Sequence, residues 1–122
     1  MPEPEKIREI IDQYTGLFSA GDRDAWLALW HQDATMEDPV GTEVRRGRDA
    51  IAEFWDSGAG SSGAQLERVS PVLVPTPNDC SFLMNVKVPL GDEELVMPAI
   101  DVMTLDDDGL ITSQRAFFDT GG

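Results

Sequence analysis

The stretch CSFLMNVKVPL, residues 80–90, followed by Gly91-Asp92 and by ELVMPAIDVMTL, residues 94–105, indicates the fold class of this 122-residue chain. Between residues 80 and 90, apolar side chains alternate with mostly polar neighbours, which is typical of a strand with one covered face. Gly91-Asp92 is a turn signal of the kind that joins two antiparallel strands. We therefore predict a long hairpin of two strands.

Shorter segments on both sides of this hairpin also have the composition of strands. They cover residues 65–74 and 110–118, and stretches rich in turn-forming residues, 75–79 and 106–109, separate them from the hairpin. Short turn segments between apolar runs are typical of antiparallel strands. We therefore expect the second half of the chain to form one sheet.

The first half of the chain has helical periodicity instead. Apolar residues recur at spacings of three and four and so share one helix face: Ile7, Ile10, Ile11, Tyr14, Leu17 and Phe18. Gly21 can end this helix in a left-handed conformation, and Asp22 can cap a second one. The second helix is expected to carry Ala25, Trp26, Leu29 and Trp30 on one face, and a third, starting near Arg48, to carry Ile51, Phe54 and Trp55. An extended piece is predicted at residues 34–37 and a mobile loop at 57–63.

Helices followed by antiparallel hairpins predict an α+β fold, in which three helices pack on one side of a curved, mainly antiparallel sheet. The chain shows no internal repeat and no long linker, so we expect residues 1–122 to form a single domain. A helix layer on a curved sheet encloses a pocket between the two layers.

The composition excludes several classes of partner. The formal net charge is -14, from 23 acidic residues against 9 Lys and Arg, so nucleic acid and anionic membranes are not expected partners. The acidic N-terminus has no signal-peptide pattern, and the single Cys80 can form no intrachain disulfide, so we expect a cytoplasmic location. One Cys and one His, His31, do not predict a metal site.

Three polar residues interrupt apolar or turn patterns. Tyr14 lies within the apolar stripe of the first helix, and Asp38 stands before Pro39 at an irregular segment. Asp101 shares its strand face with Met97, Ala99, Met103 and Leu105, where ionisation is unfavourable, so it is expected to stay protonated or to find a donor. Each could be structural instead: a core tyrosine bonded to a backbone carbonyl, a turn aspartate, or a carboxylate held by an arginine. Together, two neutral donors and one base would form a coherent enolisation site.

At these residues the sequence resembles bacterial ketosteroid isomerase, the steroid Δ5-3-ketoisomerase family, within the NTF2-like, SnoaL-like superfamily. The resemblance lies in the segments 10–14 (IIDQY), 33–41 (DATMEDPVG) and 100–103 (IDVM). It implies a cone-shaped pocket, a homodimer and catalysis without cofactor or metal. It also implies that Asp38 moves a proton from C4 to C6 of a 3-oxo-Δ5-steroid, while Tyr14 and protonated Asp101 form an oxyanion hole at the C3 oxygen.

A steroid is flat, neutral and apolar, so its pocket should be lined by apolar side chains. The expected lining residues are Trp30, Val40, Phe54, Trp55, Met84, Met97, Ala99 and Phe118. Some relatives have a tyrosine where Trp55 and Trp30 stand, and an indole cannot reproduce a bond between two phenols. Phe118 matches a position that is Phe or Trp in relatives, so an indole bond to Asp38 is not expected.

Two alternatives stay open at this point. The same scaffold could carry a polyketide-type cyclase or an epoxide hydrolase, but epoxide opening calls for an arginine near the two acids, and cyclases of this kind use a His–Asp arrangement. His31 is expected near the end of the second helix, on the solvent side. The other alternative is a non-catalytic module that binds apolar small molecules.

Overall fold

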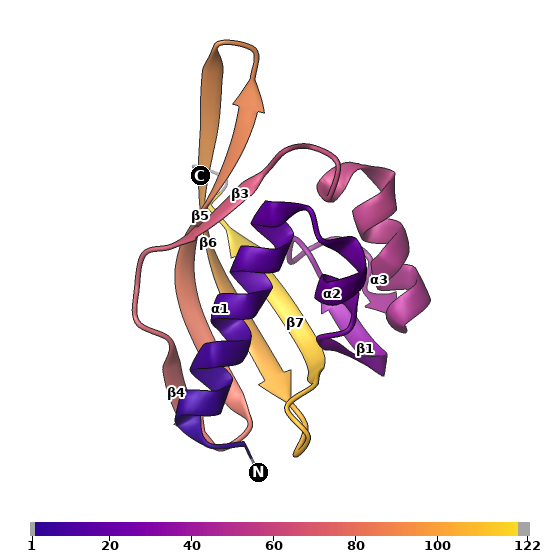
Figure 1. Ribbon diagram of the computed structural model, residues 1–122, viewed down its shortest axis with the longest axis vertical. Coiled ribbons are helices and arrows are strands. Elements are labelled where there is room, and N and C mark those ends of the chain that lie inside the picture. The colour runs from indigo at the N-terminus through magenta and orange to yellow at the C-terminus, as the bar shows by residue number, and fades with distance from the viewer. Residues whose placement is uncertain (1, 120–122) are drawn as a thin grey trace.

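The protein, described here by a computed structural model over residues 2–119, has the predicted α+β architecture. The helices are α1 (Pro4–Ala20), α2 (Arg23–Leu27) and α3 (Arg48–Phe54), and α3 continues into a π-helical turn, η1 (Trp55–Ala59). The strands are β1 (Trp30–Glu37), β2 (Arg45–Arg46), β3 (Gln65–Arg68), β4 (Leu73–Thr76), β5 (Asp79–Leu90), β6 (Glu93–Leu105) and β7 (Ile111–Phe118). Figure 1 shows the helices packed against one face of the sheet.

The described strands form one sheet in the order β2-β1-β7-β6-β5-β3, with β4 also pairing with β5. All pairs are antiparallel except β1 with β7, so the sheet is mainly antiparallel, as expected. The predicted hairpin is confirmed: β5 and β6 pair along their whole length, from Asp79 opposite Thr104 to Leu90 opposite Glu93. Its far end projects beyond the rest of the molecule (Figure 1).

The ends of α1 and the start of α2 follow local sequence signals. Pro4 stands in the first turn of α1, where a missing N–H costs nothing. Gly21 has a left-handed φ of 72°, and its N–H reaches carbonyls in the last turn. The Asp22 side chain then accepts a hydrogen bond from the Ala25 N–H at 3.4 Å, which caps α2. Both predicted helix boundaries are confirmed.

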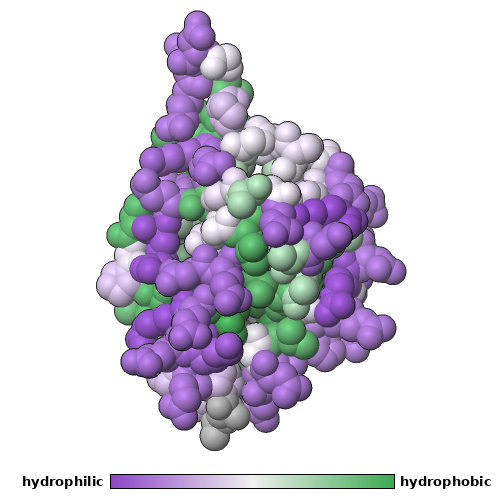
Figure 2. Space-filling model, in the orientation of Figure 1, coloured by the Kyte–Doolittle hydropathy of each residue, from purple (hydrophilic) through white to green (hydrophobic). Residues whose placement is uncertain are grey.

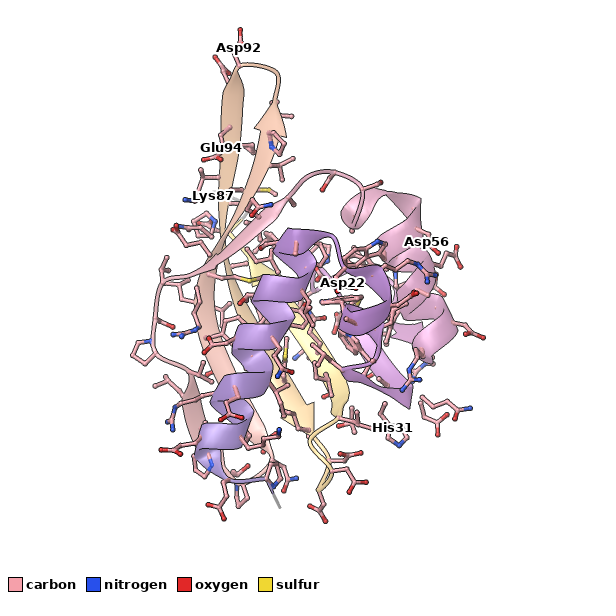
Figure 3. The ribbon with its side chains drawn as sticks, in the orientation of Figure 1. Asp22, His31, Asp56, Lys87, Asp92 and Glu94 are labelled. Atoms are coloured by element: carbon pink, nitrogen blue, oxygen red, sulfur yellow. The ribbon has the colours of Figure 1, made fainter. Side chains whose placement is uncertain are left out.

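The predicted extent of the second helix is wrong. It ends at Leu27, and Trp30 begins β1, where it lies opposite Ile111 of β7. Pairing with β7 overrides the helical periodicity here, because the Ile111 N–H donates to the Leu29 carbonyl at 2.9 Å. His31 therefore lies in a strand and not at a helix end, and Figure 3 shows it at the outer edge of the molecule.

Two further boundaries differ from the prediction. The strand expected at residues 65–74 is divided into β3 and β4, because Pro71 has no N–H to donate and the Ser70 hydroxyl bonds the Leu83 N–H instead. The loop expected at 57–63 begins later, since η1 continues through Ala59. Gly60 follows directly, and a Cβ there would stand 2.1 Å from the Trp55 indole, so only glycine fits against this ring.

The core lies between the helices and the sheet and is built mainly from fully buried large side chains, including Ile7, Ile11, Trp26, Trp30, Met36, Ile51 and Met103. Hydrophilic side chains cover most of the outer face over the helices, with an apolar strip between α1 and α2 (Figure 2). Among residues 2–119, no helix is long and apolar enough to cross a membrane.

Candidate active site

Tyr14, Asp38 and Asp101 come from three different elements and meet at one interior site. Tyr14 lies on the buried face of α1, Asp38 directly follows β1, and Asp101 is central in β6. The backbone explains why the two aspartates are close. The Val40 N–H donates to the Ala116 carbonyl at 2.8 Å, and Ala116 is the cross-strand neighbour of Asp101. The loop that carries Asp38 is thus held beside the strand that neighbours Asp101.

Asp101 is completely buried among apolar neighbours. Phe82 and Ala116 lie opposite it on β5 and β7, and Ala99 shares its face of β6. Neither carboxyl oxygen has a hydrogen-bond partner within residues 2–119. Burial, and then the charge of Asp38, raise the pKa of Asp101 well above its ordinary value, while the nearby Gln114 amide, outside hydrogen-bond geometry, acts weakly in the opposite direction. These effects favour the neutral acid, which can donate one hydrogen bond.

Asp38 has a different environment. Its side chain is half-buried, and its Oδ2 accepts a hydrogen bond from Nε2 of Gln114 at 3.1 Å. Burial raises the pKa of Asp38, whereas the Gln114 bond and the positive charge of Arg45 act in the opposite direction. The ionised form of Asp38 thus has a donor and a nearby cation, which suits a general base.

Tyr14 is positioned by aromatic packing. Its ring centroid lies 5.7 Å from that of Trp26 and 6.2 Å from that of Trp30. Burial raises the pKa of its hydroxyl well above the ordinary value; the nearby Asp101 and Asp38 carboxyl groups raise it further, and the nearby Gln114 amide lowers it. The hydroxyl therefore stays protonated and can act as a donor beside Asp101.

An apolar cavity of about 170 Å³ opens above Tyr14 and Asp38. Of the predicted lining residues, Phe54, Met84 and Phe118 line it. The other five are not among its lining residues: Trp30, Val40, Trp55, Met97 and Ala99. Trp30 and Trp55 are buried behind it, and Trp55 packs on Phe18 and Trp26 with centroids 5.0 and 5.1 Å apart.

Some lining residues were missed by sequence reasoning. Phe18, Val86 and Val88 line the cavity, together with small residues of the segment 59–64. Phe18 lies one helical turn after Tyr14, and the two valines continue the inward alternation after Met84. Periodicity could therefore have identified these three, because they share a face with residues already selected.

A second, polar cleft of about 870 Å³ lies on the other side of Asp38. Its lining includes Glu43, Arg45 and Glu53, and it shares Asp38 and Phe54 with the apolar cavity. The Arg45 guanidinium lies over the Phe54 ring, 5.4 Å from the centroid. Asp38 therefore stands at the boundary between an apolar cavity and a charged cleft.

The sequence interpretation also missed Gln114, which bonds Asp38. Its signal was a polar residue on the inward face of β7, two positions before Ala116 and four before Phe118. Within residues 2–119 no group of three or more His, Cys, Asp and Glu side chains is placed to hold a metal ion. The polar groups present can remove a proton beside a carbonyl and hydrogen-bond the oxygen that becomes negative.

Tyr14 and Asp38 line the apolar cavity, whereas Asp101 is fully buried next to it and is not among the lining residues. Helices over an open curved sheet with this cavity define an NTF2-like α+β domain. The chain belongs to the SnoaL-like domain family, whose sequence profile matches residues 11–114. It is 38% identical over 117 residues to a steroid Delta-isomerase of Nocardioides simplex, covering 95% of this chain and 92% of that protein.

Solved structures have the same fold. One is SalBIII, described as an epoxide hydrolase/cyclase-like enzyme in pyran ring formation in polyether salinomycin. It superposes with a TM-score of 0.89 and 27% identity, covering 99% of this chain and 96% of that one. Another is a computationally designed 17-OHP binder, with a TM-score of 0.84 and 18% identity over 95% and 92% of the two chains.

Proposed function

We propose that the protein is a steroid Δ-isomerase that moves the double bond of 3-oxo-Δ5-steroids into conjugation with the ketone. The observation that carries the proposal is the contrast between the two aspartates that share the site. Asp101 is fully buried with two unpartnered oxygens, whereas Asp38 has the Gln114 donor and the cation Arg45. The identity with the Nocardioides simplex enzyme supports the choice of a steroid.

In the proposed reaction, ionised Asp38 removes a proton from C4 of the substrate and returns it to C6. The C3 oxygen gains negative charge as the dienolate forms. Tyr14 and neutral Asp101 donate hydrogen bonds to this oxygen, and these bonds strengthen as the charge develops. Because the proton moves within one molecule, the chemistry requires no cofactor.

The cavity indicates how the substrate would lie. Its volume of about 170 Å³ is below the ~300 Å³ at which ligand pockets usually begin. We therefore expect it to enclose only the reacting end of a steroid. The remainder would extend along the apolar side chains of Val86 and Val88 toward the projecting hairpin.

The test is the ultraviolet absorbance of the conjugated enone, followed after a 5-ene-3-one steroid is added to purified protein. Asp38→Asn should lower the rate by at least about 10²-fold, because the base is lost. The exposed Asp33→Asn serves as the control and should retain the wild-type rate. A wild-type protein that forms no enone, or an Asp38→Asn variant of full activity, would refute the proposal.

A second candidate is epoxide opening or cyclisation, which the likeness to SalBIII favours. Asp38 and Asp101 lie close together here, and the positive charge of Arg45 lowers the pKa of Asp38. Epoxide hydrolysis, however, calls for a water held between ionised acids, and burial keeps Asp101 protonated. Formation of a diol from an epoxide probe, with no enone from the steroid, would select this candidate.

We also propose that the protein is a homodimer and acts in the cytoplasm. On the outer face of the sheet, Leu83, Ile100 and Phe117 lie side by side across β5, β6 and β7, each at least 38% exposed. A second copy would cover this apolar row. Light scattering should report a dimer, and Ile100→Glu should shift it to a monomer; a wild-type monomer at micromolar concentration would contradict the proposal.

A further inference from the structure

Gln114 is a polar side chain at a fully buried position between two methionines. It lies in the middle of β7, opposite Met103 of β6 and Met36 of β1, and all three residues are fully buried. A third methionine would fill this row of the sheet without any need for hydrogen bonds. A buried amide is unfavourable unless its polar atoms are paired, so the partners of Gln114 explain its presence.

The amide nitrogen of Gln114 hydrogen-bonds Asp38, the proposed base. Nε2 of Gln114 donates to Oδ2 of Asp38 at 3.1 Å. The bond restricts rotation of the carboxylate and leaves the other oxygen, Oδ1, to receive a proton. It also favours the ionised form of Asp38, against the effect of burial.

The acceptor half of the amide is unpaired. Oε1 of Gln114 is buried without a partner within the described residues, and so are both oxygens of Asp101. Because Met103 lies opposite Gln114 and Asp101 lies opposite Ala116, the two side chains are diagonal neighbours on adjacent strands, within reach of a long side chain. Three acceptors thus lack a donor, and the proton of neutral Asp101 would supply one.

We infer that Gln114 is a positioning residue that connects the base to the acid. Its Nε2 orients ionised Asp38 for proton transfer, and its Oε1 accepts the proton of Asp101 until the C3 oxygen of a substrate replaces it. This inference rests on the proposed function for its catalytic consequence. The hydrogen bond to Asp38 and its effect on ionisation do not depend on which reaction the site performs.

Other charged and titratable groups also face Asp38. Tyr14 approaches from α1, Asp101 from β6 and Arg45 from β2, while Glu43 and Glu53 line the polar cleft beside it. A change at Gln114 leaves Arg45, Glu43 and Glu53 unaffected, but it also removes the effect of the amide on Tyr14 and Asp101. The lost bond to Asp38 lowers the stability of its ionised form directly, so the titration of Asp38 itself is the readout.

The test variant is Gln114→Met, which matches the neighbouring Met36 and Met103. Removing a hydrogen bond to a charged group should move the acid limb of the kcat/KM profile upward by about 1 to 2 pH units. Ser113→Ala, on the opposite face of the same strand, is the control and should leave the limb unchanged. In an Asp38→Asn background, Gln114→Met should cause a smaller loss of rate than in the wild type, because the part of its effect that acts through Asp38 is already lost.

Titration of the carboxyl carbon of Asp38 by NMR, assigned with Asp38→Asn, gives a readout that needs no activity. An upward shift of the Asp38 pKa in Gln114→Met supports the inference. This holds even if the wild type converts no steroid, a result that would overturn only the proposed reaction. Should Gln114→Met not fold, Gln114→Glu removes the same donor and should raise the titration further. An unchanged titration in a folded variant of either kind would overturn the inference.

Discussion

Replacing Asp101 by asparagine should stabilise the protein at neutral pH, although the residue is fully buried in the candidate site. Burial and the charge of Asp38 raise the pKa of Asp101 well above its ordinary value, so the folded protein keeps a proton that the unfolded chain releases. Retaining this proton becomes increasingly costly as the pH rises. Asparagine has nearly the same shape and no proton to retain, and its amide offers a donor to Oε1 of Gln114, which has no partner within the described residues.

The sign and size follow from proton linkage. An unfolded aspartate titrates near pH 3.9, so above that pH the folded state binds one more proton than the unfolded state. Stability from this group is fully present below about pH 4. It is lost as the pH rises toward the folded pKa, at about 1.4 kcal/mol per pH unit. The wild type should therefore lose stability relative to Asp101→Asn at this slope as the pH rises from 5 toward the folded pKa of Asp101.

Urea unfolding at pH 5, 6, 7 and 8, at one protein concentration, measures this difference. Asp79→Asn is a control of opposite sign. Hydrogen bonds from Thr76 and Thr104 lower the pKa of Asp79, so Asp79→Asn should be less stable than the wild type at pH 5 to 8, by an amount that does not change with pH in that range. If the stabilities of the wild type and Asp101→Asn change in parallel from pH 5 to pH 8, Asp101 is ionised in the folded state and the reasoning fails.

Four other outcomes are expected. Tyr14→Phe should lower kcat for the enone reaction by about 10² to 10³-fold, because one donor to the C3 oxygen is lost; full activity in this variant would exclude that role. The acid limb of the wild-type kcat/KM profile should lie above the ordinary titration of an aspartate, because burial raises the pKa of Asp38. Gly60→Ala should cost about 1 to 3 kcal/mol in urea unfolding, because its Cβ would overlap the Trp55 indole. Gly16→Ala, in an open position of α1, should instead gain up to about 1 kcal/mol.

The elements that the sequence predicts well are those with long, strict periodicity. Residues 80–105 alternate over enough positions to define both strands of the hairpin, and α1 has a complete apolar stripe between a proline and a glycine. The boundary between α2 and β1 was not predictable in the same way. Leu29 and Trp30 fit the apolar face of a helix equally well, and only the pairing of Trp30 with Ile111, far along the chain, determines the strand.

The candidate site was predictable where a polar residue interrupts an apolar pattern. Tyr14 and Asp101 both stand in otherwise apolar faces. Gln114 obeys the same rule on β7, yet β7 is short and its neighbouring positions are half-buried and mixed in polarity, so the interruption is less visible. A buried residue lines the cavity only where the helix face and the sheet face do not pack against each other. Sequence periodicity predicts which residues are buried, but not where this space is left. Trp30 shows this, since it is as buried as any lining residue but packs behind Tyr14.

The two protonation states follow from where each aspartate lies on its strand. Asp101 is central in β6, where strands on both sides remove water and pairing uses the backbone donors, so no N–H is left for a carboxylate. Asp38 lies just past the end of β1, beside the polar cleft, where an amide and a cation can reach it. Strand ends expose backbone and side-chain donors, whereas strand centres conceal them. The same side-chain type is therefore favoured as a neutral acid in one position and can ionise more readily in the other, which is the division of roles that we propose, and the register between β6 and β7 places the two together.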